Sequence, residues 1–164
     1  MQRSLTGCFL VSLFLGWMLV SSTASAQTGL PVPRFASLAS SEVNVRVGPG
    51  KRYPIAWTFT RVGWPVEIIA EYEFWRQIRD IEGATGWIHK SLLSGRRTIL
   101  ITGQRRPIFE EPADNGVVVL LAEPGVQGRL LECDGPWCEV DIAGNKGWLR
   151  ASHFYGVYEN EKIR

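Results

Sequence analysis

The sequence lacks an excess of either charge: 18 Lys and Arg residues stand against 16 Asp and Glu residues, for a net charge of +2. Proteins that hold nucleic acid by its phosphates need a strongly basic surface, which this composition does not provide. The arginine pairs at 96–97 and 105–106 fall in a connecting segment, where we expect them to be solvated. Nucleic acid is therefore excluded as a partner.

Residues suited to catalysis or metal binding are also scarce. The only two histidines are His89 and His153, and neither is accompanied by a serine or cysteine in a recognised nucleophile motif. The adjacent carboxylates Glu110 and Glu111 would point to opposite faces of a strand. We predict no catalytic residue, no metal site and no cofactor.

Long hydrophobic runs are absent except near the start, where 13 residues from Cys8 to Val20 are mostly apolar. That run is too short to span a bilayer. With the basic residue before it and the Ala24-Ser25-Ala26 ending after it, it is typical of a secretory signal peptide over 1–26, cleaved before Gln27. A retained anchor is the alternative, while a lipoprotein is disfavoured because Cys8 precedes the apolar run. We expect export and no stable membrane insertion.

The chain carries an internal repeat. The segments Trp75–Ile78 and Gly86–Ile88 recur as Trp137–Val140 and Gly147–Leu149, at offsets of 62 and 61 residues. A short alternating run, a polar turn and a second run are typical of a β-hairpin. The repeat therefore predicts two copies of one small unit. Units of about 60 residues are near the lower size limit for independent folding, so we expect the copies to pack against each other as a rigid pair.

The remaining pattern is that of an all-β protein. Short β-rich runs separated by glycine- and proline-bearing turns indicate small antiparallel barrels; in the first copy they cover residues 41–47, 55–60, 66–72, 74–80 and 85–89. Residues 27–35, with Pro31 and Pro33, are expected to form an unpaired extended leader. An ungapped offset of 62 aligns Ile55, Trp57 and Phe59 with Val117, Val119 and Leu121, which predicts a shared core face.

Two cysteines, Cys133 and Cys138, remain after signal cleavage and flank a four-residue turn. Export favours a disulfide between them across the hairpin, with two free thiols as the alternative. Their counterparts at an offset of 62 are Glu71 and Arg76. We infer that the same cross-strand position holds a disulfide in the second copy and an opposite-charge pair in the first.

The motif NVRVGPG at 44–50, Gly63 before Pro65-Val66, the Trp75 run and GWIHKSLL at 86–93 together resemble the bacterial SH3-like domain. The likeness spans roughly 36–158 and is closest to small exported proteins of Gram-negative bacteria. It implies two consecutive five-stranded SH3-like barrels, at 36–96 and 97–158, followed by a tail at 159–164. It also implies a periplasmic location.

Five residues of the first copy are candidate ligand contacts. Alternation from Ile78 places Trp75 on the face opposite the core, unless a bulge or the other domain covers it. Arg46 and Asn44 could bind a peptide carboxylate, although Arg46 could instead pin its own loop. Tyr53 is an aromatic wall or a turn anchor. By likeness to eukaryotic SH3 domains, His89 occupies the proline position of their peptide groove and Leu92 the tyrosine position, which does not favour polyproline binding.

Trp87 and Trp148 are expected to be structural, closing the barrel ends. The segment at 106–112, which corresponds to the loop 44–50, keeps none of its Asn, Arg or Gly residues. We therefore expect the first copy to bind.

The resemblance implies a non-catalytic module that binds a peptidoglycan peptide or an envelope protein. The alternatives are a structural interaction scaffold and a minor cell-wall hydrolase. The sequence indicates no oligomeric state.

Overall fold

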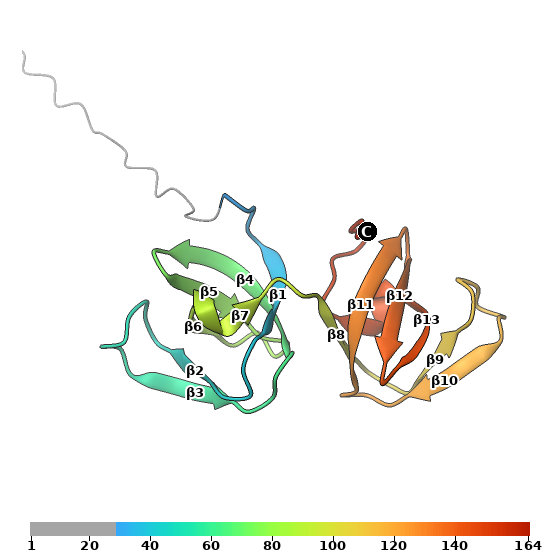
Figure 1. Ribbon diagram of the computed structural model, residues 1–164, viewed down its shortest axis with the longest axis horizontal. Helices are drawn as coiled ribbons and strands as arrows, with labels where there is room; N and C mark the ends of the chain where they lie inside the picture. The colour runs from blue at the N-terminus through green and yellow to red at the C-terminus, as the bar shows by residue number, and fades with distance from the viewer. Residues whose placement is uncertain (1–28) are drawn as a thin grey trace, which may run out of the picture.

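The structure is a computed structural model that describes residues 29–164, and it contains two β-barrels in succession (Figure 1). The predicted signal peptide, Cys8 and the expected cleavage site lie outside the described residues. Each barrel is built on an antiparallel seven-stranded sheet, which confirms the all-β tandem fold.

In the first barrel the strands follow the order β3-β2-β6-β5-β4-β1-β7. Their bounds are β1 Arg34–Leu38, β2 Val43–Arg46, β3 Ile55–Phe59, β4 Pro65–Tyr72, β5 Trp75–Arg79, β6 Thr85–His89 and β7 Leu93–Ser94, with the 3-10 helix η1 at Lys90–Leu92. The second barrel repeats this layout in the order β10-β9-β13-β12-β11-β8-β14. Its bounds are β8 Thr98–Ile101, β9 Arg106–Phe109, β10 Val118–Ala122, β11 Gln127–Asp134, β12 Trp137–Ile142, β13 Asn145–Arg150 and β14 Phe154–Tyr155, with η2 at Ala151–His153.

The five β-rich runs predicted for the first barrel correspond to β2–β6, and the two additional strands are β1 and β7. Strand β1 begins at Arg34, inside the segment that we expected to be an unpaired leader, and pairs with β4. Its last four residues are all buried, so it lacks the alternation by which strands are recognised. Strand β7 has only two residues, too few for any periodicity.

The ungapped alignment of the two copies is wrong in the β3 region. Trp57 lies opposite Val45, and the equivalent pair in the second barrel is Leu120 and Ile108, which makes the offset 63 rather than 62. A shift of one residue moves a strand's side chains to the other face. The three residues expected on the core face are accordingly 40–68% exposed: Val117, Val119 and Leu121. The second barrel has one residue fewer in the turn that follows this strand.

The predicted exchange of an ion pair for a disulfide is present. Glu71 lies directly opposite Arg76, as Cys133 lies opposite Cys138. The cysteines form a disulfide with a Cα–Cα distance of 4.1 Å. In the first barrel Arg76 Nε lies 3.1 Å from Glu71 Oε1, and the two side chains are only 2% and 1% exposed. The pair is thus buried, and removing one partner would leave an uncompensated charge in the interior.

The barrels pack against each other through aromatic side chains of the second barrel. The Tyr158 hydroxyl donates to Glu67 Oε1 at 2.8 Å, and the Tyr155 hydroxyl donates to the Arg79 carbonyl at 3.1 Å. The Phe35 ring lies between them, with centroid distances of 5.0 Å to Tyr155 and 4.8 Å to Tyr158. Burial, and next the hydrogen bond or charge of Glu67, raises the pKa of both hydroxyls, so they remain protonated donors at neutral pH.

The C-terminal tail docks on the second barrel. Arg97 holds Glu161 through two hydrogen bonds of 2.7 and 3.0 Å, and Ile163 exchanges backbone hydrogen bonds with Cys133. Burial alone would raise the pKa of Glu161, but the hydrogen bonds from Arg97 and from the Tyr158 amide outweigh it and lower that pKa. The tail is therefore part of the fold rather than a free extension.

Replacing Glu161 with glutamine should weaken this docking by ~1 kcal/mol, because a charge-assisted hydrogen bond is lost at a partly exposed site. The Ile163 amide should then exchange with deuterium about fivefold faster. The pKa of Glu161 is lower in the folded than in the unfolded state. The stabilisation that its charge gives to the fold is therefore fully present above the unfolded pKa of about 4.3, and it is lost as the pH falls through the folded pKa. Glu159→Gln is the matched control, and equal exchange in both variants would contradict the expectation.

Candidate functional site

One face of the first barrel's sheet collects the candidate residues. Along β5, Trp75 and Gln77 alternate with the buried Arg76 and Ile78. Along β6, Trp87 and His89 alternate in the same way with buried Gly86 and Ile88. Because residues directly opposite in an antiparallel pair share a face, these side chains lie together on what we call the outer face: Arg46, Trp75, Gln77, Trp87 and His89.

Two rows of side chains cross the outer face. Arg46 lies opposite Trp87, which in turn lies opposite Gln77. Two residues further along, Trp75 lies opposite His89 and meets it edge-on with a centroid distance of 5.5 Å. The arrangement places a cation and an amide beside half-exposed indole rings. Such a surface can stack on apolar groups and bind a carboxylate at the same time.

The loop between β2 and β3 is stabilised by contacts among its own residues. Arg46 Nη1 donates to the Tyr53 carbonyl at 2.7 Å, so the alternative in which this arginine pins its own loop is realised. The Tyr53 ring packs on Gly48, where an added Cβ would come within 2.6 Å of the ring. Tyr53 thus anchors the turn, and the glycine is required by this close approach.

His89 joins the outer face to the following 3-10 helix. Its Nδ1 accepts from the Ser91 amide at 3.3 Å and lies 2.7 Å from Ser91 Oγ. Phe74, in the turn before β5, stacks on the His89 ring at 6.2 Å, and Lys90 Nζ lies 4.9 Å from the Phe74 ring centre. His89 therefore has a structural role, because its Nδ1 joins β6 to η1. Its ring also contacts the rings of Phe74 and Trp75.

The remaining predicted contact, Asn44, is engaged with a neighbouring strand. Its Oδ1 accepts from Thr58 Oγ1 at 2.7 Å. The structure thus brings Trp75 and His89 into contact and joins Arg46 to Tyr53, but Asn44 faces Thr58. Within residues 29–164 no cluster of three potential metal ligands is present, and no helix is long and apolar enough to cross a membrane.

Three residues of the site were missed by sequence reasoning: Phe74, Gln77 and Trp87. Gln77 lies on the outer face by the same alternation from Ile78 that placed Trp75 there. Trp87 was expected to be purely structural, yet alternation from the buried Ile88 places it on the outer face by the same argument that placed Trp75 there. Phe74 is 54% exposed and lies in a turn, where periodicity carries no information. Its position directly before Trp75 was the available indication.

The second barrel carries different side chains on the equivalent face. Phe109 lies opposite Trp148, in the place that Arg46 has opposite Trp87. The Phe109 ring also packs edge-on against Trp137, the counterpart of Trp75, at 6.0 Å. Arg150, in the place of His89, lies over the same indole at 4.6 Å and pairs with Asp114. The two faces are buried to a similar degree and differ in chemistry: only the first barrel combines an arginine with the two indoles at this position.

The fold is a tandem of two small β-barrels, and the first of them carries an aromatic and polar outer face. The sequence model of the bacterial SH3 domain matches residues 39–95 and 102–156. The chain belongs to this family, and it contains two of its domains in tandem. Domains of the family typically bind the cell wall. Neither matched segment includes a catalytic domain.

Solved structures of similar shape are distant in sequence. NlpC1 from Trichomonas vaginalis is 15% identical, with 88% of this chain and 51% of that chain covered and a TM-score of 0.37. An NlpC/P60 family protein from Bacillus cereus is 14% identical, with coverages of 79% and 58% and a TM-score of 0.33. This chain thus spans about half the length of those proteins. Among curated proteins no match was found.

Proposed function

We propose that the protein is a non-catalytic periplasmic module that binds the peptide of peptidoglycan through the outer face of its first barrel. The observation that carries the proposal is the contrast between the two faces. Trp75, Trp87 and Arg46 are combined in the first barrel, whereas Phe109 takes the place of the arginine in the second. Only the first barrel therefore presents a cation beside its two indoles at this position.

The chemistry of the outer face suits a short peptide with a free carboxylate. Indole rings provide flat apolar surface at little entropic cost, and a guanidinium binds carboxylates through parallel hydrogen bonds. Arg46 uses one Nη1 bond for its loop, which fixes the orientation of the rest of its guanidinium. A stem peptide offers both aliphatic side chains and carboxylates. This agrees with the typical cell-wall binding of the family.

The proposal predicts that Trp75→Ala and Arg46→Ala each reduce retention on purified sacculi about tenfold, equivalent to ~1.4 kcal/mol. The protein is expressed from the full-length gene and co-sedimented with sacculi, and the unbound fraction is measured. Trp137→Ala is the matched control, because it removes the corresponding indole from the second barrel's face, where Phe109 replaces the arginine. Near-ultraviolet circular dichroism verifies folding. Equal retention of all three variants would show that the binding site does not lie on the outer face of the first barrel.

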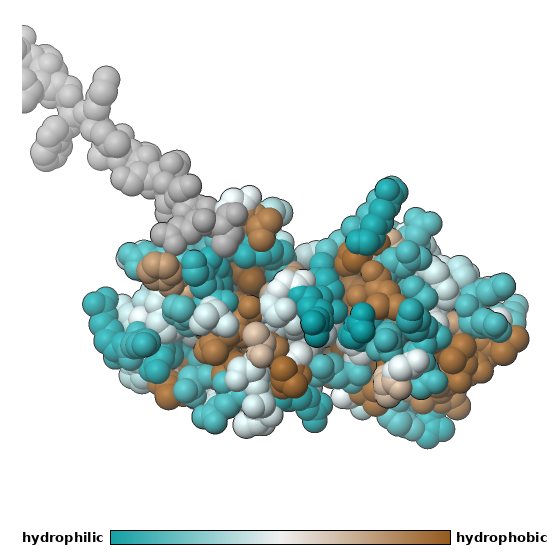
Figure 2. All heavy atoms as spheres, in the orientation of Figure 1, coloured by the Kyte–Doolittle hydropathy of each residue, from teal (hydrophilic) through white to brown (hydrophobic). Residues whose placement is uncertain are grey.

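A second candidate function, a protein-interaction scaffold, is favoured by a specific surface of the second barrel. Strand β10 is an edge strand, and apolar side chains gather along it (Figure 2). The exposed residues are Val117, Val118, Val119 and Leu121. Exposed apolar edges are suited to pairing with a strand of another protein. In-cell crosslinking from residue 119 would capture such a partner, whereas wall binding alone would leave this position unlabelled.

A further inference from the structure

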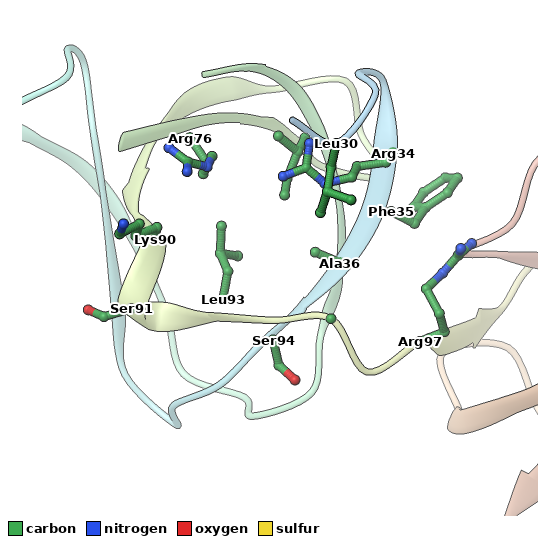
Figure 3. Close-up of a pocket in the computed structure, with 12 residues that line it drawn as sticks. Leu30, Arg34, Phe35, Ala36, Arg76, Lys90, Ser91, Leu93, Ser94 and Arg97 are labelled. Atoms are coloured by element: carbon green, nitrogen blue, oxygen red, sulfur yellow. The ribbon is translucent and has the colours of Figure 1, made fainter. Parts of the chain in front are cut away.

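The first barrel has an open cavity lined by residues of β1, β5 and β7 and, on one side, by Leu30 of the segment before β1 (Figure 3). Its volume is about 660 Å³. The floor is apolar, formed by Ala36, Ile68 and Leu93, and the Leu93 side chain points into the space. A cavity of this size accepts several residues of an extended peptide.

In the second barrel the equivalent space is filled by larger side chains and by the chain's own tail. The counterparts of Ala36 and Leu93 are Ile99 and Phe154, both buried in the core. Val157 and Ile163 pack against the same core. The tail is fixed by Glu161, which binds Arg97, and by the backbone pairing of Ile163 with Cys133. The second barrel thus holds an extended Glu-x-Ile segment as an internal ligand.

The first barrel has no such tail because of chain connectivity. After β14 the chain turns back across its own barrel, but after β7 it leaves for β8 in the second barrel (Figure 1). The residues equivalent to the docked tail are therefore used to build the second domain. The space beneath β7 remains open.

A buried cation faces this open space without full compensation. Arg76 lines the cavity with its side chain 2% exposed. Its Nε meets Glu71, and its Nη1 donates to the carbonyls of Glu73 and Trp75. Among residues 29–164 its Nη2 finds no hydrogen-bond partner. A buried donor without a partner costs free energy that a ligand acceptor would recover.

The charge around the cavity is positive on balance. Of the described residues that line it, four are cationic and none is acidic; the cations are Arg34, Arg76, Lys90 and Arg97. Arg34 and Arg76 share the carboxylate of Glu71, and Arg97 is paired with Glu161, so four cations meet two carboxylates. An anionic group is therefore the complementary one.

We propose that this cavity is a second binding site, separate from the outer face, for an extended segment of a partner protein that carries a carboxylate followed two residues later by an aliphatic side chain. The carboxylate lies among the cations Arg34, Arg76 and Lys90. The aliphatic side chain packs on Leu93 and Ala36, as Ile163 packs in the second barrel. The Glu161-Lys162-Ile163 segment supplies the pattern of the ligand.

The probe is an acetylated synthetic peptide with the sequence of residues 157–164, VYENEKIR, added in trans to protein expressed from the full-length gene. Binding is followed by two-dimensional NMR of the ¹⁵N-labelled protein. Saturable shifts are expected at Leu93, Ser94 and the Arg76 guanidinium. A peptide with glutamine in place of Glu161 should bind about tenfold more weakly.

Two double variants that copy the second barrel provide the test within the protein. Ala36→Ile with Leu93→Phe fills the cavity with the counterpart side chains, and Glu71→Cys with Arg76→Cys replaces the cation by a disulfide. Each should reduce affinity for the probe about tenfold while the fold is kept. Trp75→Ala should leave the affinity unchanged, since the outer face is a different site.

Shifts confined to the cavity and lost in both double variants would support the proposal. Three outcomes would overturn it: shifts on the outer face, shifts in the second barrel where the tail already docks, or equal binding of the glutamine peptide. Nuclear Overhauser contacts from residues preceding Leu30 to Leu93 would also overturn it, because the chain's own leader would then be the occupant.

Discussion

Replacing Arg76 with alanine is expected to destabilise the first barrel by about 3 kcal/mol. The substitution leaves Glu71 charged in a site where its side chain is 1% exposed, with Arg34 as the remaining cation. It also removes the donor that holds the carbonyls of Glu73 and Trp75, and with them the turn carrying Phe74. A domain of this size has little stability in reserve. Urea unfolding followed by tryptophan fluorescence measures the loss.

The second barrel suggests how the lost stability can be restored. Glu71→Cys combined with Arg76→Cys places two cysteines in the register that already supports a disulfide in the other copy. This double variant should regain most of the lost stability when oxidised and lose it again on reduction. Arg79→Ala is the matched control, because that arginine pairs with Glu67 but is about half exposed. If Arg76→Ala cost no more than the control, the buried pair would not be a main determinant of the fold.

The second large effect is expected at the glycine of the repeated Gly-Trp pair. An added Cβ at Gly86 would come within 2.4 Å of Val45 Cγ1 and 3.1 Å of the Arg46 carbonyl oxygen. At Gly147 it would come within 2.6 Å of the Phe109 carbonyl oxygen, which belongs to the backbone and cannot rotate away. Gly86→Ala and Gly147→Ala should therefore each cost ~1–3 kcal/mol, as overpacking does.

Thermal unfolding of the two variants measures this cost, and Gly95→Ala is the control. An added Cβ at Gly95 meets nothing within 4 Å, so its effect should stay within about 0.5 kcal/mol. A neutral Gly147→Ala would show that β9 and β13 can separate without cost. The expected result explains why glycine precedes the tryptophan in both copies: one strand must approach the next closely there.

Much of the fold could be predicted from sequence because the repeat supplies an internal comparison. The hairpin with Trp75 and Gly86 occurs twice, and the disulfide of the second copy identified Glu71 and Arg76 as a cross-strand pair. Alternation then placed Trp75 on the outer face. It would have placed Trp87 there too, had the same argument been applied to the second strand of the hairpin.

What could not be predicted depends on features without periodicity or on long-range packing. Strand β1 is buried on both faces and so shows no alternation. The insertion in the turn after β3 changes the repeat offset to 63, and only the observed pairing of Trp57 with Val45 reveals it. The docking of Glu161 on Arg97 joins residues 64 positions apart. No local sequence pattern predicts this docking. The same holds for the cavity of the first barrel, where no C-terminal tail docks.

The exchange of an ion pair for a disulfide also affects when each barrel can be completed. Glu71 and Arg76 need only to meet, so the first barrel can close its core as soon as its strands have been made. Cys133 and Cys138 must first lose two electrons to an oxidant. The first barrel precedes the second in the chain and carries the outer face that we propose as the binding site. Its assembly therefore does not depend on the redox chemistry of the compartment in which the second barrel is finished.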